Sequence, residues 1–344
     1  MGYTTPEITT LGSVAGLIAT TLRACGCDPE PLFAAAGIDL SRATDPHARF
    51  PMTRMQKLWK LAVEASGDPC LGLAAARLFQ PALLHGLGLA WLVSDTLLDA
   101  FGRLVRYARL INSALLFRLE EHPDSIDLIT VLPESLPPDF EYAATDLGIA
   151  AFLRMCQITA GHPILPCHVT LQRPQPYCLA QFEEMFGVSI EYGAPVNRIC
   201  FDRDLLARHL ASANPELARI NDQVVMDYLA RFDRDSIAMQ VRSKIIHQLP
   251  DGIPKQETIA DTLHVSLRSL QRKLKEEDTS FKDLLEETRR QLALQYLRDS
   301  RRSIGEITYL LGFSEPSNFT RAFRRWTGKS PVQYRMTGKS AFGG

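Results

Sequence analysis

The chain has 344 residues, enough for two domains with separate cores, and its net charge is −1. The charge is unevenly divided, because residues 251–344 carry 17 Lys and Arg against 12 Asp and Glu, and the remainder is acidic. A basic segment joined to an acidic one favours nucleic-acid binding confined to one end, although a solvated basic face gives the same count.

Neither a membrane span nor a signal peptide is evident. No apolar run approaches the ~18–20 residues that cross a bilayer, and no basic region precedes an apolar stretch at the N-terminus. We therefore expect a cytoplasmic protein without a membrane partner.

The cysteines and histidines do not form a recognisable catalytic or metal-binding motif. Seven cysteines are scattered along the chain, and none forms Cys-x-x-Cys. Their odd number argues against a disulfide framework, so we expect reduced, mostly buried thiols. The eight histidines are dispersed, and neither Gly-x-Ser-x-Gly nor His-Glu-x-x-His occurs. We expect no enzyme activity, no cofactor and no metal.

Residues 7–110 are expected to be mainly helical. Residues 53–65 place apolar side chains on one stripe and end before Gly67. A second helix is predicted over residues 95–111, starting from an Asp or Ser cap.

The period changes after residue 111. Residues 115–121 and 126–132 flank a polar turn and predict a β-hairpin. The elements expected next are a helix at 139–160, a strand at 167–173 with Cys167 facing the core, a helix at 177–186, an extended piece at 198–201 and a helix capped by Asp202. We therefore predict an α+β N-terminal domain with a small sheet, for sensing and dimerisation, over residues 1–211.

The rest of the chain favours an all-α C-terminal domain. A helical linker is expected over residues 212–233, and two helix-turn-helix units joined by a long helix over residues 234–338, before a tail at 339–344. In the first unit, residues 256–263 form a support helix and His264-Val265 the turn, where many such turns use glycine. Ser266 then caps a second helix with Leu267, Leu270 and Leu274 facing inward. The outward side chains of this helix are Arg268, Gln271, Arg272 and Lys275.

The second unit carries the stronger signal. A short apolar helix from Ile304 ends at Gly312, and Ser314 and Pro316 supply a start signal for the next helix. That helix buries Phe319, Ala322, Phe323 and Trp326, at helical spacing. Its outward side chains include Ser317, Asn318, Arg321, Arg324 and Arg325. Short polar groups and arginines on one face are what a major groove and its phosphates require.

A helix over residues 281–299 separates the two units. About 18 residues at roughly 1.5 Å each span on the order of 27 Å, close to the roughly 34 Å of one DNA turn. One protomer would then read two successive major grooves on one face of the duplex.

At these residues the chain resembles the AraC/XylS family of bacterial transcription regulators, over about residues 235–338. The most specific segments are Leu311-Gly-Phe-Ser314, Ser317-Asn-Phe-Thr-Arg-Ala-Phe323, Trp326-Thr-Gly-Lys-Ser-Pro331 and Tyr334-Arg335. The resemblance implies that Arg268, Gln271, Arg272, Ser317, Asn318 and Arg321 contact bases or adjacent phosphates of double-stranded DNA. Two departures are Thr308, where the family usually has alanine, and Pro316, where glutamine is frequent.

Residues 15–205 resemble the arabinose-binding-like N-terminal domain of one branch of this family. The matching pieces are Leu32–Ile38, Gly67–Leu73, Gly86–Gly88, Asp95–Phe101, Phe186–Val188 and Asn197–Phe201. The resemblance implies effector sensing, dimerisation or both, and the family expectation is an activator that recruits RNA polymerase. By composition, the candidates for small-molecule effector binding are His85, Arg106, Tyr107 and Arg109. A helix-capping histidine and solvated arginines would give the same pattern.

Two other functions fit parts of the sequence. The helical tail would serve as a protein-interaction module if the outward arginines were only a solvated face. Pro166-Cys167-His168 resembles the Pro-Cys-His of DNA alkyltransferases, which would make Cys167 an alkyl acceptor, but Val169 follows where those enzymes have arginine.

Overall fold

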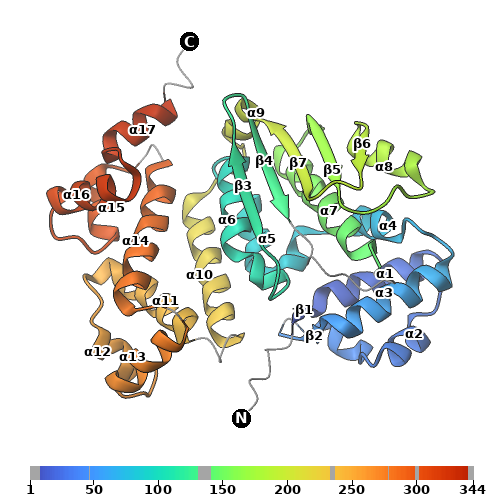
Figure 1. Cartoon of the computed structure of the whole chain (residues 1–344), viewed down its shortest axis with the longest axis horizontal. Helices are drawn as coiled ribbons and strands as arrows, with labels where there is room; N and C mark the ends of the chain where they lie inside the picture. The colour runs from blue at the N-terminus through green and yellow to red at the C-terminus, as the bar shows by residue number, and fades with distance from the viewer. Residues whose placement is uncertain are drawn as a thin grey trace. The chain divides into compact units, whose positions relative to one another are not determined.

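The computed structural model describes residues 8–45, 47–130, 141–232, 237–277, 279–298 and 302–339. The chain divides into two compact units, Met1–Val225 and Met226–Gly344. The division falls within helix α10 (Pro215–Phe232), and each unit is described by itself (Figure 1).

The first unit begins with helices, as its sequence predicts. They are α1 (Gly12–Ala24), α2 (Pro29–Ala36), α3 (Met52–Ser66), α4 (Leu71–Leu78), α5 (His85–Leu92) and α6 (Leu97–Ile111), with 3-10 turns η1 (Leu40–Thr44) and η2 (Pro81–Leu84). A two-stranded ribbon joins β1 (Thr9–Leu11) to β2 (Arg49–Pro51). The expected Asp or Ser cap of α6 is wrong, because the Thr96 hydroxyl accepts the hydrogen bond from the Asp99 backbone N–H, at 3.0 Å.

A five-stranded sheet follows, which confirms the α+β fold class. Its strands are β3 (Phe117–Glu121), β4 (Ser125–Thr130), β5 (His168–Leu171), β6 (Ile190–Tyr192) and β7 (Asn197–Asp202), in the order β3-β4-β7-β5-β6. The predicted hairpin is β3–β4, and β5 and β6 form a parallel pair. The ends of several predicted elements lie outside the described residues, namely residues 131–132, 139–140, 233–236, 299 and 340–344.

The sheet packs on helices through aromatic side chains. Phe201 of β7 lies with its ring centroid 5.8 Å from Phe101 of α6 and 6.1 Å from Phe152 of α7 (Ala143–Ala160). Two shorter helices, α8 (Leu179–Phe186) and α9 (Arg203–Ala207), precede the start of α10, which also belongs to this unit. The side chain of Asp202 accepts from the Leu205 N–H at 2.8 Å, so its predicted capping role is confirmed.

The cysteine expectations need correction. Cys70 and Cys178, at the N-caps of α4 and α8, form a disulfide. Among the free thiols, Cys156 is buried, but Cys25 and Cys167 are exposed. The sequence does not show that α4 and α8 approach each other, and Cys167 precedes the first residue of β5, so the strand pattern does not turn it toward the core.

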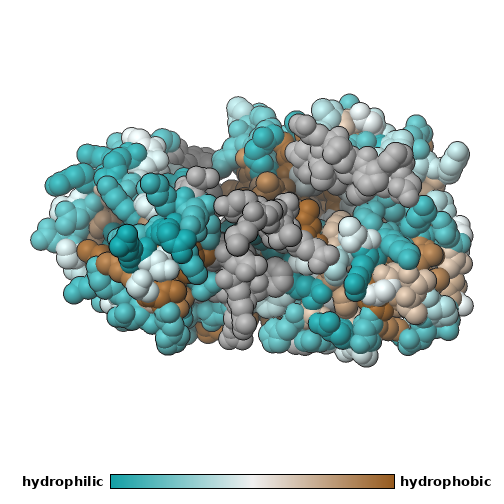
Figure 2. All heavy atoms as spheres, turned by 60° about the horizontal axis from the view of Figure 1, so that its bottom comes forward, coloured by the Kyte–Doolittle hydropathy of each residue, from teal (hydrophilic) through white to brown (hydrophobic). Residues whose placement is uncertain are grey.

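The second unit is helical. Its elements after α10 are α11 (Ile237–Gln248), η3 (Leu249–Asp251), α12 (Gln256–Thr262), α13 (Leu267–Glu276), α14 (Phe281–Arg298), α15 (Ile304–Leu310), α16 (Pro316–Thr327) and α17 (Pro331–Lys339). One hydrophobic cluster runs from Val241 and Ile245 of α11 through Leu270 of α13 to Phe319 and Phe323 of α16. The surface of the second unit is largely hydrophilic in Figure 2, with a smaller hydrophobic area. In the described residues of either unit, no helix is both long and apolar enough to cross a bilayer.

Candidate nucleic-acid interface

The first helix-turn-helix unit is formed by α12 and α13. Its turn places His264 at φ 55°, the left-handed region that glycine adopts more readily. Ser266 caps α13 as predicted, because its hydroxyl accepts from the Ser269 N–H at 3.2 Å. Leu270 and Leu274 of α13 are buried, so this helix is held by its apolar side as its sequence indicates.

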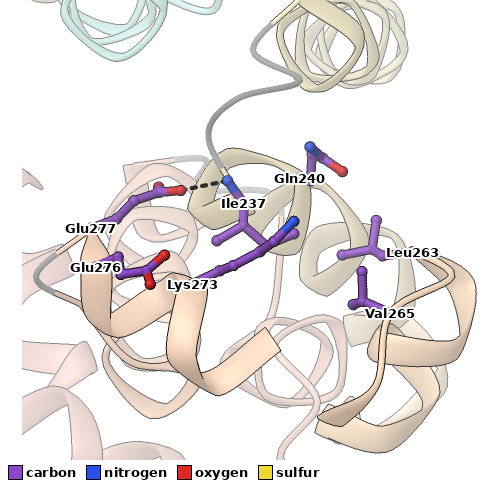
Figure 3. Close-up of a pocket in the computed structure, with 7 residues that line it drawn as sticks. All are labelled: Ile237, Gln240, Leu263, Val265, Lys273, Glu276 and Glu277. Carbon is purple, nitrogen blue, oxygen red and sulfur yellow. Dashed lines mark hydrogen bonds between the residues drawn. The ribbon is translucent and has the colours of Figure 1, made fainter. Parts of the chain in front are cut away.

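Glu277, directly after α13, ties this unit to α11. Its carboxylate accepts hydrogen bonds from the backbone N–H groups of Ile237, at 2.6 Å, and Ala238, at 3.1 Å. These N–H groups have no partner within α11, and a carboxylate at a helix N-terminus is favourable. An open pocket of about 580 Å³ lies here, and Figure 3 shows its lining residues Ile237, Gln240, Leu263, Val265, Lys273, Glu276 and Glu277.

The second unit is formed by α15 and α16. Ser303 and Glu306 make a reciprocal capping box at the start of α15. Pro316 is the first residue of α16, whereas Glu315 is its cap residue, without a side-chain bond, so the predicted start signal from Ser314 is wrong. The turn is one residue longer than that of the first unit. The hydroxyl of the family departure Thr308 is satisfied, because it donates to the Ile304 carbonyl at 2.7 Å.

The turn of the second unit is tightly packed. Gly312 has φ 68°, and a Cβ there would lie 2.7 Å from the Gly252 carbonyl oxygen and 3.0 Å from that of Leu249. Only glycine can adopt this left-handed backbone conformation and also approach the two carbonyl oxygens so closely without strain.

Arg289 of α14 supports this turn, and the sequence analysis missed it. Its guanidinium donates to the carbonyl oxygens of Leu311 and Gly312, both at 2.9 Å. It also lies 4.3 Å from the ring centroid of Phe313. Burial lowers the pKa of Arg289. The sequence offered no signal for this contact beyond an arginine within the predicted helix over residues 281–299.

The predicted contact residues all have exposed side chains. They are Arg268, Gln271, Arg272 and Lys275 on α13, and Ser317, Asn318, Arg321, Arg324 and Arg325 on α16. On the opposite sides of these helices, Leu270, Leu274, Phe319 and Phe323 are buried. Each helix therefore offers a polar and basic face to solvent, while its role in contacting DNA stays a prediction.

Two of these arginines have acidic partners in the DNA-free chain. Arg272 pairs with Glu276, at 2.6 Å. Arg325 pairs with Glu286 of α14, at 2.8 Å, and Glu286 also accepts from the Trp326 indole at 2.9 Å. The hydrogen bonds from Arg325 and Trp326 lower the pKa of Glu286. If these arginines bound DNA, each would leave its carboxylate partner for a phosphate group.

The effector candidates lie in different environments of the first unit. Arg106 lies over the Tyr107 ring, 5.4 Å from its centroid, and burial together with the charge of Asp222 raises the pKa of Tyr107 to about 12. Burial lowers the pKa of His85, and the neighbouring His47 and Arg49 lower it further. The exposed Arg109 donates to the Ser113 carbonyl, at 3.3 Å.

A buried ion-pair network adjoins Arg106 and Tyr107. Arg103 of α6 is 3% exposed and contacts Asp222 of α10, at 3.1 Å, and Asp99. Burial lowers the pKa of Arg103, but the two carboxylates raise it above its ordinary value. It also donates to the Ser94 hydroxyl at 2.9 Å. The start of α10 is thereby fixed to α6 within the first unit.

Both parts of the chain match families of known proteins. Residues 26–210 match the model of the arabinose-binding N-terminal domain of AraC transcription regulators, and residues 259–337 match a helix-turn-helix domain. The chain belongs to the AraC family. It is therefore a DNA-binding transcription regulator, as the sequence predicts, and its relatives are regulators rather than enzymes.

Individual relatives of this AraC-family chain cover most or half of its length. It is 31% identical over 311 residues to the ornithine utilization regulator of Pseudomonas aeruginosa, covering 90% of this chain and 91% of the relative. It is 31% identical over 193 residues to the regulator VirS of Mycobacterium tuberculosis, covering 56% of each. The crystal structure of CdpR from Pseudomonas aeruginosa matches at 22% identity, 90% and 96% coverage and a TM-score of 0.43.

Proposed function

We propose that this regulator reads two successive major grooves, one with α13 and one with α16. The observation that carries the proposal is that both helices bury an apolar side and expose a face of arginines and short polar groups. Such faces supply base contacts and phosphate contacts together. The alternative is a protein-interaction module, in which the same arginines contact an acidic partner.

Selection of bound sequences from a random DNA pool by the full chain tests this proposal. We expect one enriched motif with two contacted blocks about one helical turn apart. A variant carrying both Arg272→Ala and Arg321→Ala should lose the enrichment, while Arg23→Ala, an exposed arginine of α1 in the first unit, should retain it. Failure of the parent chain to enrich any motif at low or moderate salt would favour the interaction module.

The chain is proposed to act as a homodimer through α10. Leu217, Ile220 and Val224 are 45%, 45% and 51% exposed, and their spacing of three and four residues forms one stripe of the helix. If a second copy of the chain packed against α10 through the same stripe, the apolar side chains of both stripes would be buried. Sedimentation of the full chain should give a dimer, and Ile220→Glu should give a monomer that retains its far-ultraviolet circular dichroism.

The first unit is proposed to bind a small-molecule effector and, in the bound state, to favour a dimer that activates transcription by recruiting RNA polymerase. Arg106 and Tyr107 are the first candidate contacts, because they adjoin the Arg103–Asp222 pair that holds α10, followed by His85 and Arg109. One relative is named for ornithine utilization, so amino acids and amines are the first compounds to screen. A true effector should raise the Tm of the parent chain, and it should raise the Tm of the Arg106→Met variant by a smaller amount.

A further inference from the structure

A second cluster of charged side chains and potential metal ligands lies on the sheet of the first unit. The strand register places Glu120 of β3 opposite Asp127 of β4, Asp127 opposite Cys200 of β7, and Cys200 opposite His168 of β5. Residues directly opposite each other in antiparallel strands project from the same face. The row therefore shares the face opposite to the one from which Phe201 enters the core.

Three side chains near this row bring ligand atoms together. Glu120, His122 and Asp127 each offer one oxygen or nitrogen atom, and these atoms all lie within 4.8 Å of one another. Ligand atoms of one tetrahedral zinc ion, each about 2.0–2.3 Å from it, lie roughly 3.3–3.8 Å apart. The three atoms would therefore have to move closer together, by rotation of their side chains, to bind one ion.

Cys200 lies opposite Asp127 in the strand register. Its sulfur is not one of the three ligand atoms that lie within 4.8 Å of one another, so its side chain would have to turn toward them to become a fourth ligand. Burial raises the pKa of Cys200 to about 12, and a hydrogen bond with the Asp127 side chain contributes to the increase. The thiol is therefore linked to the Asp127 side chain by a hydrogen bond as well as by the strand register. A bound cation ionises a coordinating thiol, because it replaces the proton as the positive charge beside the sulfur.

The charge of Asp127 is balanced by side chains that can move. Asp127 is 3% exposed, with Arg198 at 3.0 Å and His122 at 3.4 Å from its carboxylate. The Arg198 side chain is 35% exposed and also lies 3.8 Å from Glu120. A divalent ion among these carboxylates would take over the role of Arg198, which has room to turn into solvent.

The turn that carries His122 is held in place by its backbone. The His122 N–H donates to the Ser125 carbonyl at 2.9 Å. Arg203 donates to the His122 carbonyl at 3.1 and 2.9 Å, and pairs with Glu121 at 3.1 Å. A fixed backbone limits the entropy lost when the imidazole binds an ion.

We propose that Glu120, His122, Asp127 and Cys200 bind one divalent transition-metal ion of the zinc class. A set of carboxylate, imidazole and thiolate ligands suits zinc and cobalt better than calcium or magnesium. Coordination by the Cys200 sulfur would release the thiol proton to solvent. The ion links the β3–β4 hairpin to β7. The predicted hairpin already contains Glu120, His122 and Asp127, but a search for short metal-binding motifs does not pair residues across two strands, and Cys200 is brought close only by the strand register.

Zinc binding by the full chain tests the proposal, measured by equilibrium dialysis against zinc alone. The parent should bind one ion per chain, and His122→Gln should weaken binding at least about tenfold. His209→Gln is the matched control, because His209 is also an exposed histidine 3.0 Å from an aspartate, Asp95, without the other ligands. A second control replaces the Cys25 and Cys27 thiols with serine. Both controls should bind zinc like the parent, and circular dichroism should show every variant folded.

Cobalt in place of zinc tests the sulfur ligand. The parent should show a sulfur-to-cobalt charge-transfer band, and Cys200→Ser should lose this band. Three results would overturn the proposal: no zinc bound by the parent, equal binding by the parent and His122→Gln, or loss of binding only with the Cys25 and Cys27 replacements. A parent cobalt complex without the charge-transfer band would overturn the assignment of Cys200.

Discussion

The two helix-turn-helix units have turns of similar backbone conformation, but they form them with different residues. Both turns require a left-handed residue, which is His264 at φ 55° in the first unit and Gly312 at φ 68° in the second. Gly312 also lies against the backbone of η3, whereas His264 is exposed. The second turn is therefore constrained by packing and the first mainly by backbone preference, so equal substitutions should have unequal effects.

The largest expected effect is that of Gly312→Ala. Left-handed backbone costs a non-glycine residue about 1–2 kcal/mol, and the clash with two carbonyl oxygens adds to this, so we expect a loss of about 3 kcal/mol of unfolding free energy. The matched variant His264→Ala should change it by less than about 1 kcal/mol, because alanine only replaces one left-handed side chain with another. Urea unfolding monitored by circular dichroism measures both, and equal losses would contradict the difference between the turns.

Arg289→Met should lower stability by about 2 kcal/mol, because two carbonyl oxygens lose their donor and Phe313 loses its cation. Methionine retains most of the apolar stem. Arg290→Met on the same helix is the control. Arg290 pairs with the partly exposed Glu287 at 2.8 Å, so its replacement should cost less than about 1 kcal/mol. A loss for Arg290→Met as large as that for Arg289→Met would show that Arg289 has no special role in the second turn.

Arg272→Ala and Arg321→Ala should each weaken binding to the selected DNA by about 1–3 kcal/mol while leaving the Tm unchanged. Arg272 must leave Glu276 to bind DNA and Arg321 has no resolved ion pair among the described residues, so Arg321→Ala should cost more. Fluorescence anisotropy over a salt series measures both losses. Wild-type affinity in both variants would place the recognition helices elsewhere.

His264→Gly should stabilise the chain by about 0.5–1 kcal/mol, because glycine adopts the left-handed conformation without a Cβ penalty. No stabilising substitution of this kind exists for the second turn, which already has glycine. Thermal unfolding should show a higher Tm, and a lower Tm would mean that the imidazole makes a contact that compensates for its backbone strain.

The smallest expected effect is a pH dependence of the second unit. The pKa of Glu286 is lowered by Arg325 and Trp326, so its contribution to stability is present above the unfolded-state pKa and is lost as pH falls through the lower folded-state value. The loss should be modest because Glu286 is partly exposed and screened. In Glu286→Gln this part of the acid dependence should disappear, and an unchanged profile would rule out the ion pair as its source.

Local patterns in the sequence predicted most elements but not the contacts between distant ones. The Ser266 and Asp202 caps and the buried leucines of α13 depend on neighbours within a few residues, so the pattern was sufficient. The Cys70–Cys178 disulfide joins residues 108 positions apart, and the support of the Gly312 turn by Arg289 spans more than 20. Such contacts depend on how helices pack, which periodicity does not report.

The Arg103–Asp222 pair limits where the chain can be truncated to give a stable fragment. The match to the arabinose-binding domain ends at residue 210, yet Asp222 lies beyond it and is one of the two carboxylates that balance a buried guanidinium. A fragment ending there would leave Arg103 short of a counter-charge, and breaking a buried pair by removing one partner costs about 3–5 kcal/mol. A sensor fragment should therefore extend through at least Asp222, and shorter fragments should be less stable for a reason unrelated to their ligand.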